Sequence, residues 1–473
     1  MGRIRWYVAL LALVVLVAGG GTAAYVLGGF DRWLDDTEDS ALDIEPPEEL
    51  EFPDARAAQP VLGPAAPAPI ATSKVERAVR AVLKKRKLGK HNGVAVAPLT
   101  KGPSVTVGSG TYLPASTLKN FTSVAALASM GAEKRFETSV VRTGGANGNT
   151  AALTLVGGGD PLLATKRPTD DDTYPEPATL TDLANQTAKA LDEQGASRVR
   201  LGYDDSLFKG PDINSRWESG YISTDVTTPV SALWADEGID NKTKNRTTEP
   251  ADQAARKFAK LLSKRGVKVV GSPSHKQAPR EADSVASVTS PSLDQIVQEL
   301  ITHSNNEATE VVLRHLAISE GKPASFKGGV TAMRSVLTDL GVPWKQMRVY
   351  DGSGLSRDNR VTLRAELSIL RIAATSRNPD LHAVAEGMPV AGFSGSLADR
   401  FTSPTVYGGL GFARAKTGTL TGVHAYAGYT TDKNGTPLAF VAITNKVKDK
   451  NVLKARTALD DIAASLTSCA CSR

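Results

Sequence analysis

Cysteine is nearly absent from this chain of 473 residues, with only Cys469 and Cys471 at its far end. Two cysteines there cannot cross-link a core, and a disulfide between residues two apart is strained and uncommon. We therefore expect a flexible C-terminal tail. The sequence also lacks C-x-x-C, H-E-x-x-H and comparable clusters, and its six histidines are scattered. We predict neither a metal site nor a cofactor.

Aromatic residues are also scarce, at 5% of the chain, whereas hydrophobic residues of all kinds reach 41%. Alanine, glycine and valine are plentiful, so the cores should be built from small and β-branched side chains. The charged fraction of 22% is ordinary for a globular protein, and the length allows two or three domains. Composition by itself assigns no function.

The first 30 residues contain a long hydrophobic run. Arg3 and Arg5 precede an uncharged stretch, 6–30, that is long enough to span a bilayer as one helix. The flanking arginines favour the cytoplasm, which would export everything that follows. Small residues at 18–24 also fit a cleaved signal peptide. We favour a transmembrane anchor, and both alternatives predict that the rest of the chain lies outside the cytoplasm, either membrane-anchored or secreted.

The net charge of the chain indicates which class of partner it binds. The net charge of +6 suits an anionic partner. Because the chain is predicted to be exported, we expect wall polymers or lipid headgroups rather than nucleic acid. Residues 31–72 begin with an acidic run and continue into a proline- and alanine-rich stretch. Charge repulsion and proline prevent a core there, so we predict a disordered linker.

The sequence after the linker predicts a sheet assembled from both ends of the chain. Ser73 and Glu76 form a capping box that begins a helix. Short β-rich runs within 93–110 predict a hairpin, and 413–446 predicts further strands before a closing helix at 452–466. Helices around terminal strands, with other material between them, indicate an α+β fold.

We therefore divide the folded part of the chain into a body, 73–132 and 272–473, and an inserted domain, 133–271. The insert carries predicted strands and helices of its own, with no repeat period. They lie at 153–156, 180–195, 198–202 and 253–266. We expect the insert to form a separate lobe whose removal leaves the body intact.

A serine and a lysine three residues apart open the second predicted helix of the body. Ser116 and Lys119 share one helix face, so the hydroxyl can hydrogen-bond the amine. A serine needs a base to become nucleophilic, and lysine serves when burial and a nearby cation keep it neutral. The helix N-terminus adds N–H groups that stabilise a developing oxyanion. By itself S-x-x-K is as well explained by a surface lysine.

Two further motifs follow in the chain. Ser304-Asn305-Asn306 lies where a predicted helix at 293–302 ends and another begins, although a polar turn there is commonplace. Lys416-Thr417-Gly418-Thr419 opens a predicted strand. Gly418 permits a close backbone approach, and such a strand can pair with an extended peptide. Lys416 and Thr417 could hold a terminal carboxylate.

The order S-x-x-K, S-x-N, K-T-G is the signature of penicillin-binding proteins and class A β-lactamases. More specifically, the chain resembles the PBP4-like, class C low-molecular-mass penicillin-binding proteins, D-Ala-D-Ala carboxypeptidase/endopeptidases of peptidase family S13. The resemblance covers roughly residues 73–466. Further segments that carry it are 155–161, 204–208, 229–233, 351–357 and 392–400.

The resemblance implies a β-lactamase/transpeptidase-like body, an antiparallel sheet flanked by helices, with an inserted α/β domain. It implies that Ser116 attacks the carbonyl between two D-alanines of a peptidoglycan stem peptide and that Lys119 takes its proton. Ser304 and Lys416 would pass a proton to the leaving amine. Asn306 would orient Lys119 and bind substrate.

The resemblance also implies binding roles. Thr417, Gly418 and Thr419 would bind substrate along the strand, and the N–H groups of Ser116 and Thr419 would form the oxyanion hole. Arg357 could reach substrate or form a structural ion pair. β-Lactams would trap the same serine as covalent inhibitors.

Other functions remain open. A class A β-lactamase needs a glutamate to activate deacylating water, and no E-x-x-x-N lies between Ser304 and Lys416. A class C β-lactamase or related serine esterase would carry Tyr-x-Asn in place of residues 304–306. A non-catalytic penicillin-binding wall module would not need all three motifs. The membrane is a further partner if the N-terminal helix is uncleaved.

Overall fold

The computed structural model describes residues 69–472, apart from 86, 101, 148, 169–172 and 241–242. The predicted anchor or signal peptide at 1–30, and the linker up to residue 68, lie outside the described residues. Among those that are described, no helix is long and apolar enough to cross a bilayer.

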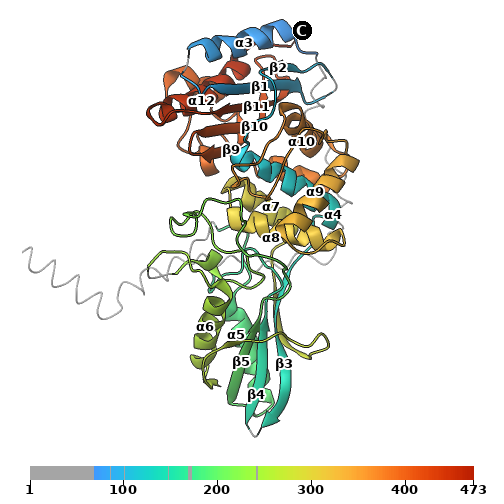
Figure 1. Ribbon diagram of the computed structural model, residues 1–473, viewed down its shortest axis with the longest axis vertical. Coiled ribbons are helices and arrows are strands. Elements are labelled where there is room, and N and C mark those ends of the chain that lie inside the picture. Colours follow the sequence, from blue (N-terminus) through green and yellow to red (C-terminus); the bar gives the residue numbers. More distant parts are fainter. Residues whose placement is uncertain are drawn as a thin grey trace, which may run out of the picture. The chain divides into compact units, whose positions relative to one another are not determined.

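A five-stranded antiparallel sheet joins the two ends of the described chain (Figure 1). The strand order is β2-β1-β11-β10-β9. The strands are β1 (His91–Pro98), β2 (Val105–Val107), β9 (Arg414–Leu420), β10 (Val423–Thr431) and β11 (Pro437–Asn445). This confirms the predicted N-terminal hairpin and the sheet built from both ends.

The alternation of side chains along β1 explains how the sheet is covered. Val94 and Val96 face a core shared with helices α3 (Thr72–Lys85) and α12 (Val452–Ser468). Ala95 and Ala97 face the opposite core, which includes α4 (Lys119–Met130) and α10 (Leu363–Thr375). Successive strand residues point to opposite faces, so one strand contributes to both cores.

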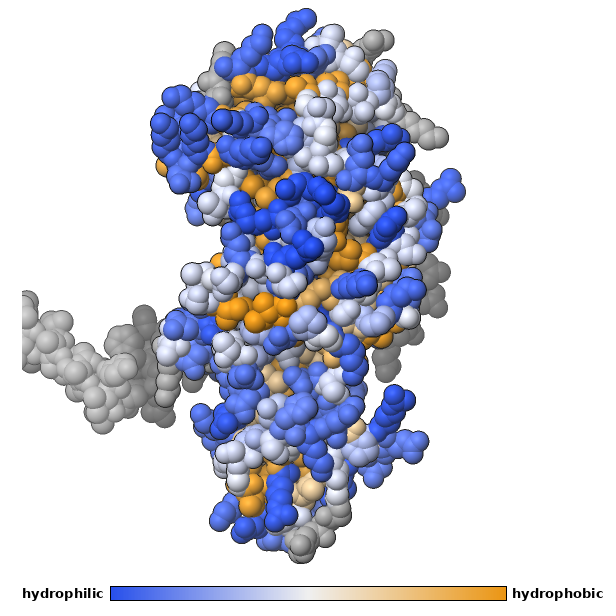
Figure 2. All heavy atoms as spheres, in the orientation of Figure 1, coloured by the Kyte–Doolittle hydropathy of each residue, from blue (hydrophilic) through white to orange (hydrophobic). Residues whose placement is uncertain are grey.

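Helices complete the second of these cores. Besides α4 and α10 it contains α7 (Leu293–Thr302), α8 (Asn306–Ser319) and α9 (Phe326–Asp339). The short α11 (Ala383–Glu386) closes it. The turn between α7 and α8 falls at 303–305, where the sequence predicted an interhelical turn. Hydrophilic residues cover most of the face drawn in Figure 2, which agrees with apolar residues gathered inside.

A second, mixed sheet is built from the middle of the chain (Figure 1). Its order is β6-β5-β4-β3-β8, with β7 also on β5. The strands are β3 (Glu137–Asn147), β4 (Thr150–Val156), β5 (Arg198–Asp204), β6 (Lys268–Val269), β7 (Ser274–His275) and β8 (Ser284–Thr289). Helices α5 (Leu180–Glu193) and α6 (Pro250–Ser263) share its core. Because β7 and β8 follow residue 271, this sheet extends past the predicted end of the insert.

The C-terminal tail is not loose, so the prediction of a flexible tail was wrong. Cys469 and Cys471 form a disulfide, and Cys471 is fully buried. The carbonyl of Cys471 accepts a hydrogen bond from the N–H of Ala71 at 2.7 Å, and Asp432 accepts one from the N–H of Ser472 at 2.7 Å. These partners are distant in sequence, so no local pattern signalled them.

Candidate active site

Ser116 lies in a 3₁₀ turn, η1 (Ala115–Leu118), that leads directly into α4. The preceding Ala115 has φ 50°, in the left-handed region that non-glycine residues rarely adopt. A loop presses on this backbone: a Cβ at Gly354 would lie 1.9 Å from the Ala115 carbonyl oxygen. The Thr117 hydroxyl donates a hydrogen bond to Glu366 Oε1 at 2.6 Å, which ties the turn to α10. The strained turn before the serine is thus held from two sides.

Lys119 is fully buried and joins the first two motifs. Its Nζ lies 3.1 Å from Ser116 Oγ, 2.8 Å from Asn306 Oδ1 and 2.9 Å from the carbonyl oxygen of Ser353. The last two oxygens only accept hydrogen bonds. A neutral amine has two N–H donors and one lone pair, so these acceptors occupy both donors. The lone pair is thereby left for the hydroxyl of Ser116.

The electrostatics of Lys119 suit a base near neutral pH. Burial lowers its pKa to about 8, while the nearby carboxylates of Glu310, Asp351 and Glu307 oppose that shift. Burial also lowers the pKa of Lys416 well below its usual value, and the positive charge of Lys119 lowers it further. Two buried ammonium groups repel one another, so the pair favours at least one neutral amine.

The second motif forms the turn between α7 and α8. Ser304 has φ 62°, and Asn305 caps α8 by accepting a hydrogen bond from the N–H of Ala308 at 2.9 Å. Asn306 Nδ2 donates to the carbonyl oxygen of Val226 at 3.1 Å while its Oδ1 faces Lys119. Because Val226 lies in the predicted insert, the insert contacts the second motif directly through a backbone carbonyl.

The third motif lies on β9, the last strand of its sheet. Lys416 is fully buried, with its Nζ 3.1 Å from the Thr417 carbonyl oxygen. A Cβ at Gly418 would come within 2.6 Å of the Pro114 carbonyl oxygen and 3.2 Å of Ser116 N. Only glycine therefore lets the strand pass so close to Ser116.

All three motifs meet at one cavity of about 360 Å³. Of the predicted site residues, its lining includes Ser116, Ser304, Asn306, Thr417 and Thr419. Lys119 and Lys416 are buried, and Lys119 is hydrogen-bonded to lining groups. Residues 218, 221 and 226, from the predicted insert, line the same cavity.

Arg357 lies at the margin of this cavity. It donates to the Thr421 carbonyl oxygen at 2.9 Å, and its Nε lies 3.8 Å from Glu218 Oε1. Thr421 and Glu218 both line the cavity. Arg357 therefore contacts two lining residues, one of them through an ion pair.

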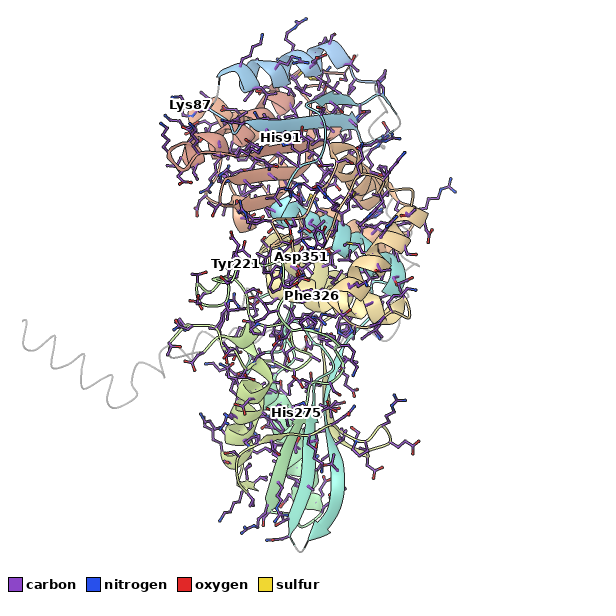
Figure 3. The ribbon with its side chains drawn as sticks, viewed as in Figure 1. Lys87, His91, Tyr221, His275, Phe326 and Asp351 are labelled. Atoms are coloured by element: carbon purple, nitrogen blue, oxygen red, sulfur yellow. A yellow bond between two sulfur atoms is a disulfide. The ribbon has the colours of Figure 1, made fainter. Side chains whose placement is uncertain are left out.

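Sequence reasoning missed Glu310, one of two buried carboxylates that hold the loop 351–356; the other, Asp351, lies in a segment that carries the resemblance. Glu310 accepts from the N–H of Ser353 at 2.7 Å and from that of Gly352 at 3.0 Å. Asp351 accepts from Trp217 Nε1 at 2.8 Å and from the N–H of Ser356 at 2.6 Å. Both Asp351 and Tyr221 are labelled in the region between the two sheets in Figure 3, and the Tyr221 hydroxyl donates to the Leu355 carbonyl oxygen of the same loop at 3.4 Å. A signal for Glu310 existed: it follows Asn306 by four residues on one helix face.

Two other acidic and basic residues of the resembling segments are structural. Asp160 accepts a hydrogen bond from the N–H of Leu162 at 2.9 Å, which is turn chemistry. Arg400 pairs with Asp460 at 2.8 Å. In the described part of the chain no group of histidine, cysteine and carboxylate side chains could hold a metal ion.

The sequence matches the peptidase family described as D-Ala-D-Ala carboxypeptidase 3 (S13) over residues 75–246 and 239–466. A carboxypeptidase of Mycobacterium tuberculosis is 34% identical over 364 residues, 76% of this chain and 76% of that protein. The carboxypeptidase DacB of Mycolicibacterium smegmatis is 32% identical over 362 residues, with the same shares of the two chains.

Solved structures support the fold. Penicillin binding protein 4 (dacB) of Haemophilus influenzae matches with a TM-score of 0.68 at 23% identity, covering 82% of this chain and 98% of that one. The same protein complexed with a β-lactam matches with a TM-score of 0.61 at 22% identity. With the sheet and helices described above, these matches confirm the predicted α+β fold class.

Proposed function

The chain belongs to the D-Ala-D-Ala carboxypeptidase 3 (S13) family of peptidases, and from that membership we propose that it hydrolyses the D-Ala-D-Ala bond of peptidoglycan stem peptides with Ser116 as nucleophile. The observation that carries the proposal is the contact of one buried amine, Lys119, with both Ser116 Oγ and Asn306 Oδ1. A general base within hydrogen-bond reach of the hydroxyl is what serine acylation requires.

Acylation begins when the lone pair of neutral Lys119 takes the hydroxyl proton of Ser116. The Oγ then bonds to the carbonyl carbon of the penultimate D-alanine. The N–H groups of Ser116 and Thr419 would stabilise the oxyanion. The close passage of Gly418 by Ser116 supports this pairing of donors.

The leaving group is the amine of the terminal D-alanine, which must gain a proton as the C–N bond breaks. The proton that Lys119 took from Ser116 would reach this amine through Ser304, which lines the same cavity, and the positive charge of Lys416 would assist the transfer. The ammonium form of Lys416 and the Thr417 hydroxyl would hold the terminal carboxylate. Water then hydrolyses the ester on Ser116.

β-Lactams should acylate the same serine. Their leaving amine stays tethered to the acyl group, so it blocks the hydrolytic water. That a related protein was solved with a bound β-lactam supports this. Gly418 and Thr419 would bind the substrate backbone as an added strand along β9, and Arg357 would contact substrate at the margin of the cavity.

The substrate sets the location. Peptidoglycan lies outside the bacterial cytoplasm, so we infer an extracytoplasmic enzyme of the cell envelope. Membrane anchoring through 6–30 stays a prediction, as does the division into a body, 73–132 and 272–473, and an insert, 133–271.

The test is incubation of the purified protein with muropeptides, followed by mass spectrometry. Loss of one alanine from pentapeptide stems indicates carboxypeptidase activity, and separation of cross-linked dimers indicates endopeptidase activity. Ser116→Ala is the control and should produce neither. Unchanged muropeptides with a folded, penicillin-reactive protein would instead favour a non-catalytic wall module. Rapid release of hydrolysed penicillin would favour a β-lactamase.

A further inference from the structure

One arginine of the central region, Arg246, contacts three other segments of the chain beside the second motif. Its NH1 lies 2.6 Å from Glu307 Oε1, the residue directly after Asn306. Its Nε donates to the carbonyl oxygen of Asp225 at 3.1 Å, and its NH1 lies 3.2 Å from the carbonyl oxygen of Glu237. Its backbone N–H also donates to Asp225 Oδ1 at 2.8 Å. The Arg246 side chain is only 14% exposed, so these bonds are largely shielded from water.

Glu307 links Arg246 to α8, the helix that begins at Asn306. It is 2% exposed and, besides Arg246, accepts a hydrogen bond from the N–H of Thr228 at 3.1 Å. A carboxylate buried this deeply needs a charged partner and further hydrogen bonds to stay ionised. Burial raises the pKa of Glu307 to about 7, while the positive charge of Arg246 and the hydrogen bond from Thr228 oppose that shift. The start of α8 is thereby fastened to the segment 225–228.

That segment decides which way the amide of Asn306 points. The carbonyl oxygen of Val226 can only accept, so it selects the Nδ2 end of the amide. The Oδ1 end then faces Lys119, where it accepts one of the two N–H donors. A flipped amide would present N–H groups to Lys119 and compete for the lone pair that Ser116 needs.

We propose that Arg246 is a positioning residue for acylation: by pairing with Glu307 and holding segment 225–228, it keeps the oxygen of the Asn306 amide turned toward Lys119. The inference rests on the proposed function, because it presupposes that Lys119 is the base for Ser116. Arg246 does not line the cavity, so it acts through Asn306 and not on substrate.

The test uses the purified protein. Stopped-flow acylation by a fluorescent penicillin separates reversible binding from the acylation rate constant. Arg246→Met should lower the rate constant about tenfold or more, as misplacing a catalytic group does, and leave reversible binding within about twofold. Arg246→Lys should recover part of the loss. Arg256→Met is the matched control, because Arg256 pairs with Asp252 on the surface of α6 and should react normally.

A double-mutant cycle gives the decisive readout. In an Asn306→Ala background, Arg246→Met should cost less than twofold, because the group it positions is gone. Equal fold losses in both backgrounds would overturn the proposal, as would a normal rate constant in folded Arg246→Met. If Arg246→Met does not fold, Arg246→Lys enters the cycle in its place.

A crystal structure of the Arg246 variant serves if Asn306→Ala reacts too slowly to measure. Separation of Asn306 Oδ1 from Lys119 Nζ beyond hydrogen-bond distance is expected, and an unchanged contact would overturn the proposal. These outcomes are distinct from failure of the proposed function, which would show as an unlabelled Ser116 in the unmodified protein.

Discussion

In the proposed mechanism Lys119 is the base, and its two hydrogen-bond acceptors leave its lone pair directed at Ser116. Its two acceptor partners are set by separate parts of the chain: Asn306 by the 225–228 segment, and the Ser353 carbonyl by Glu310. Replacing Lys119 with alanine should therefore reduce acylation by at least ~10²–10⁴ at neutral pH without unfolding the protein. Penicillin labelling with circular dichroism checks this, and near-normal acylation would identify another base.

The pKa of Lys119 predicts how acylation depends on pH. The neutral amine is the active form, so the rate should rise with pH through the pKa of about 8 and fall about tenfold per pH unit well below it. Glu310 is the largest of the charges that raise this pKa. Glu310→Gln keeps an acceptor for the N–H groups of Gly352 and Ser353, but removes the charge. The midpoint should move to lower pH.

The matched control is Glu320→Gln, at the C-terminal end of the same helix, which should leave the pH profile unchanged. A Glu310→Gln midpoint that stays in place or moves to higher pH would show that Lys119 does not set the profile. Initial acylation rates across pH 6–10 provide the measurement.

Lys416 should matter chiefly for substrates with a free C-terminal carboxylate. Burial holds its pKa low in the free protein, and a bound carboxylate would favour the ammonium form. Lys416→Ala should therefore lower kcat/KM for D-Ala-D-Ala peptides more than for an analogue with a neutral C-terminus. Lys433→Ala, on an exposed turn, is the control. Equal losses on both substrates would show that Lys416 acts in proton transfer alone and does not hold the carboxylate.

At the scale of elements, the loop 351–356 and β9 bring glycines against the backbone at Pro114–Ser116. Gly354 and Gly341 have nearly the same backbone angle, φ 87° and 83°. A Cβ at 354 would lie 1.9 Å from the Ala115 carbonyl oxygen, whereas nothing lies within 4 Å of one at 341. In both alanine variants the left-handed conformation should lower the free energy of unfolding by about 1–2 kcal/mol.

Gly354→Ala should therefore slow acylation of Ser116 by at least about tenfold, because the turn that carries the serine must shift. Gly341→Ala should lose a similar amount of backbone stability but acylate normally. Chemical denaturation and penicillin kinetics on the two variants make the comparison. Equal acylation rates would show that the contact with Ala115 does not position the nucleophile.

Most elements were predictable because their signals are local. The apolar spacing of Leu293–Thr302 gave α7 its observed bounds, and the two β-rich runs before residue 110 gave the hairpin. The tail at Cys471 was mispredicted because its partners, Ala71 and Asp432, are distant in sequence. The contact between Asn306 and Val226 uses a backbone carbonyl, which every residue carries, so no side-chain pattern could reveal it.

At the scale of the whole molecule, the three motifs begin at Ser116, Ser304 and Lys416, far apart in the sequence, and meet at one cavity. The order of the motifs predicted that meeting, since each alone is explained equally well by a surface feature. The order of the motifs did not predict that the central region, 133–271, also contacts the site. Val226 and Arg246 contact the second motif directly or through Glu307, so we expect excision of 133–271 to impair acylation.

Identification of the residue that β-lactams modify tests the central claim most directly. The purified protein is incubated with a fluorescent penicillin, and the adduct is located by peptide mapping and mass spectrometry. We predict one equivalent of label on Ser116, and none on folded Ser116→Ala. Label on another serine, or no label on the folded protein, would contradict the assignment of Ser116 as the nucleophile.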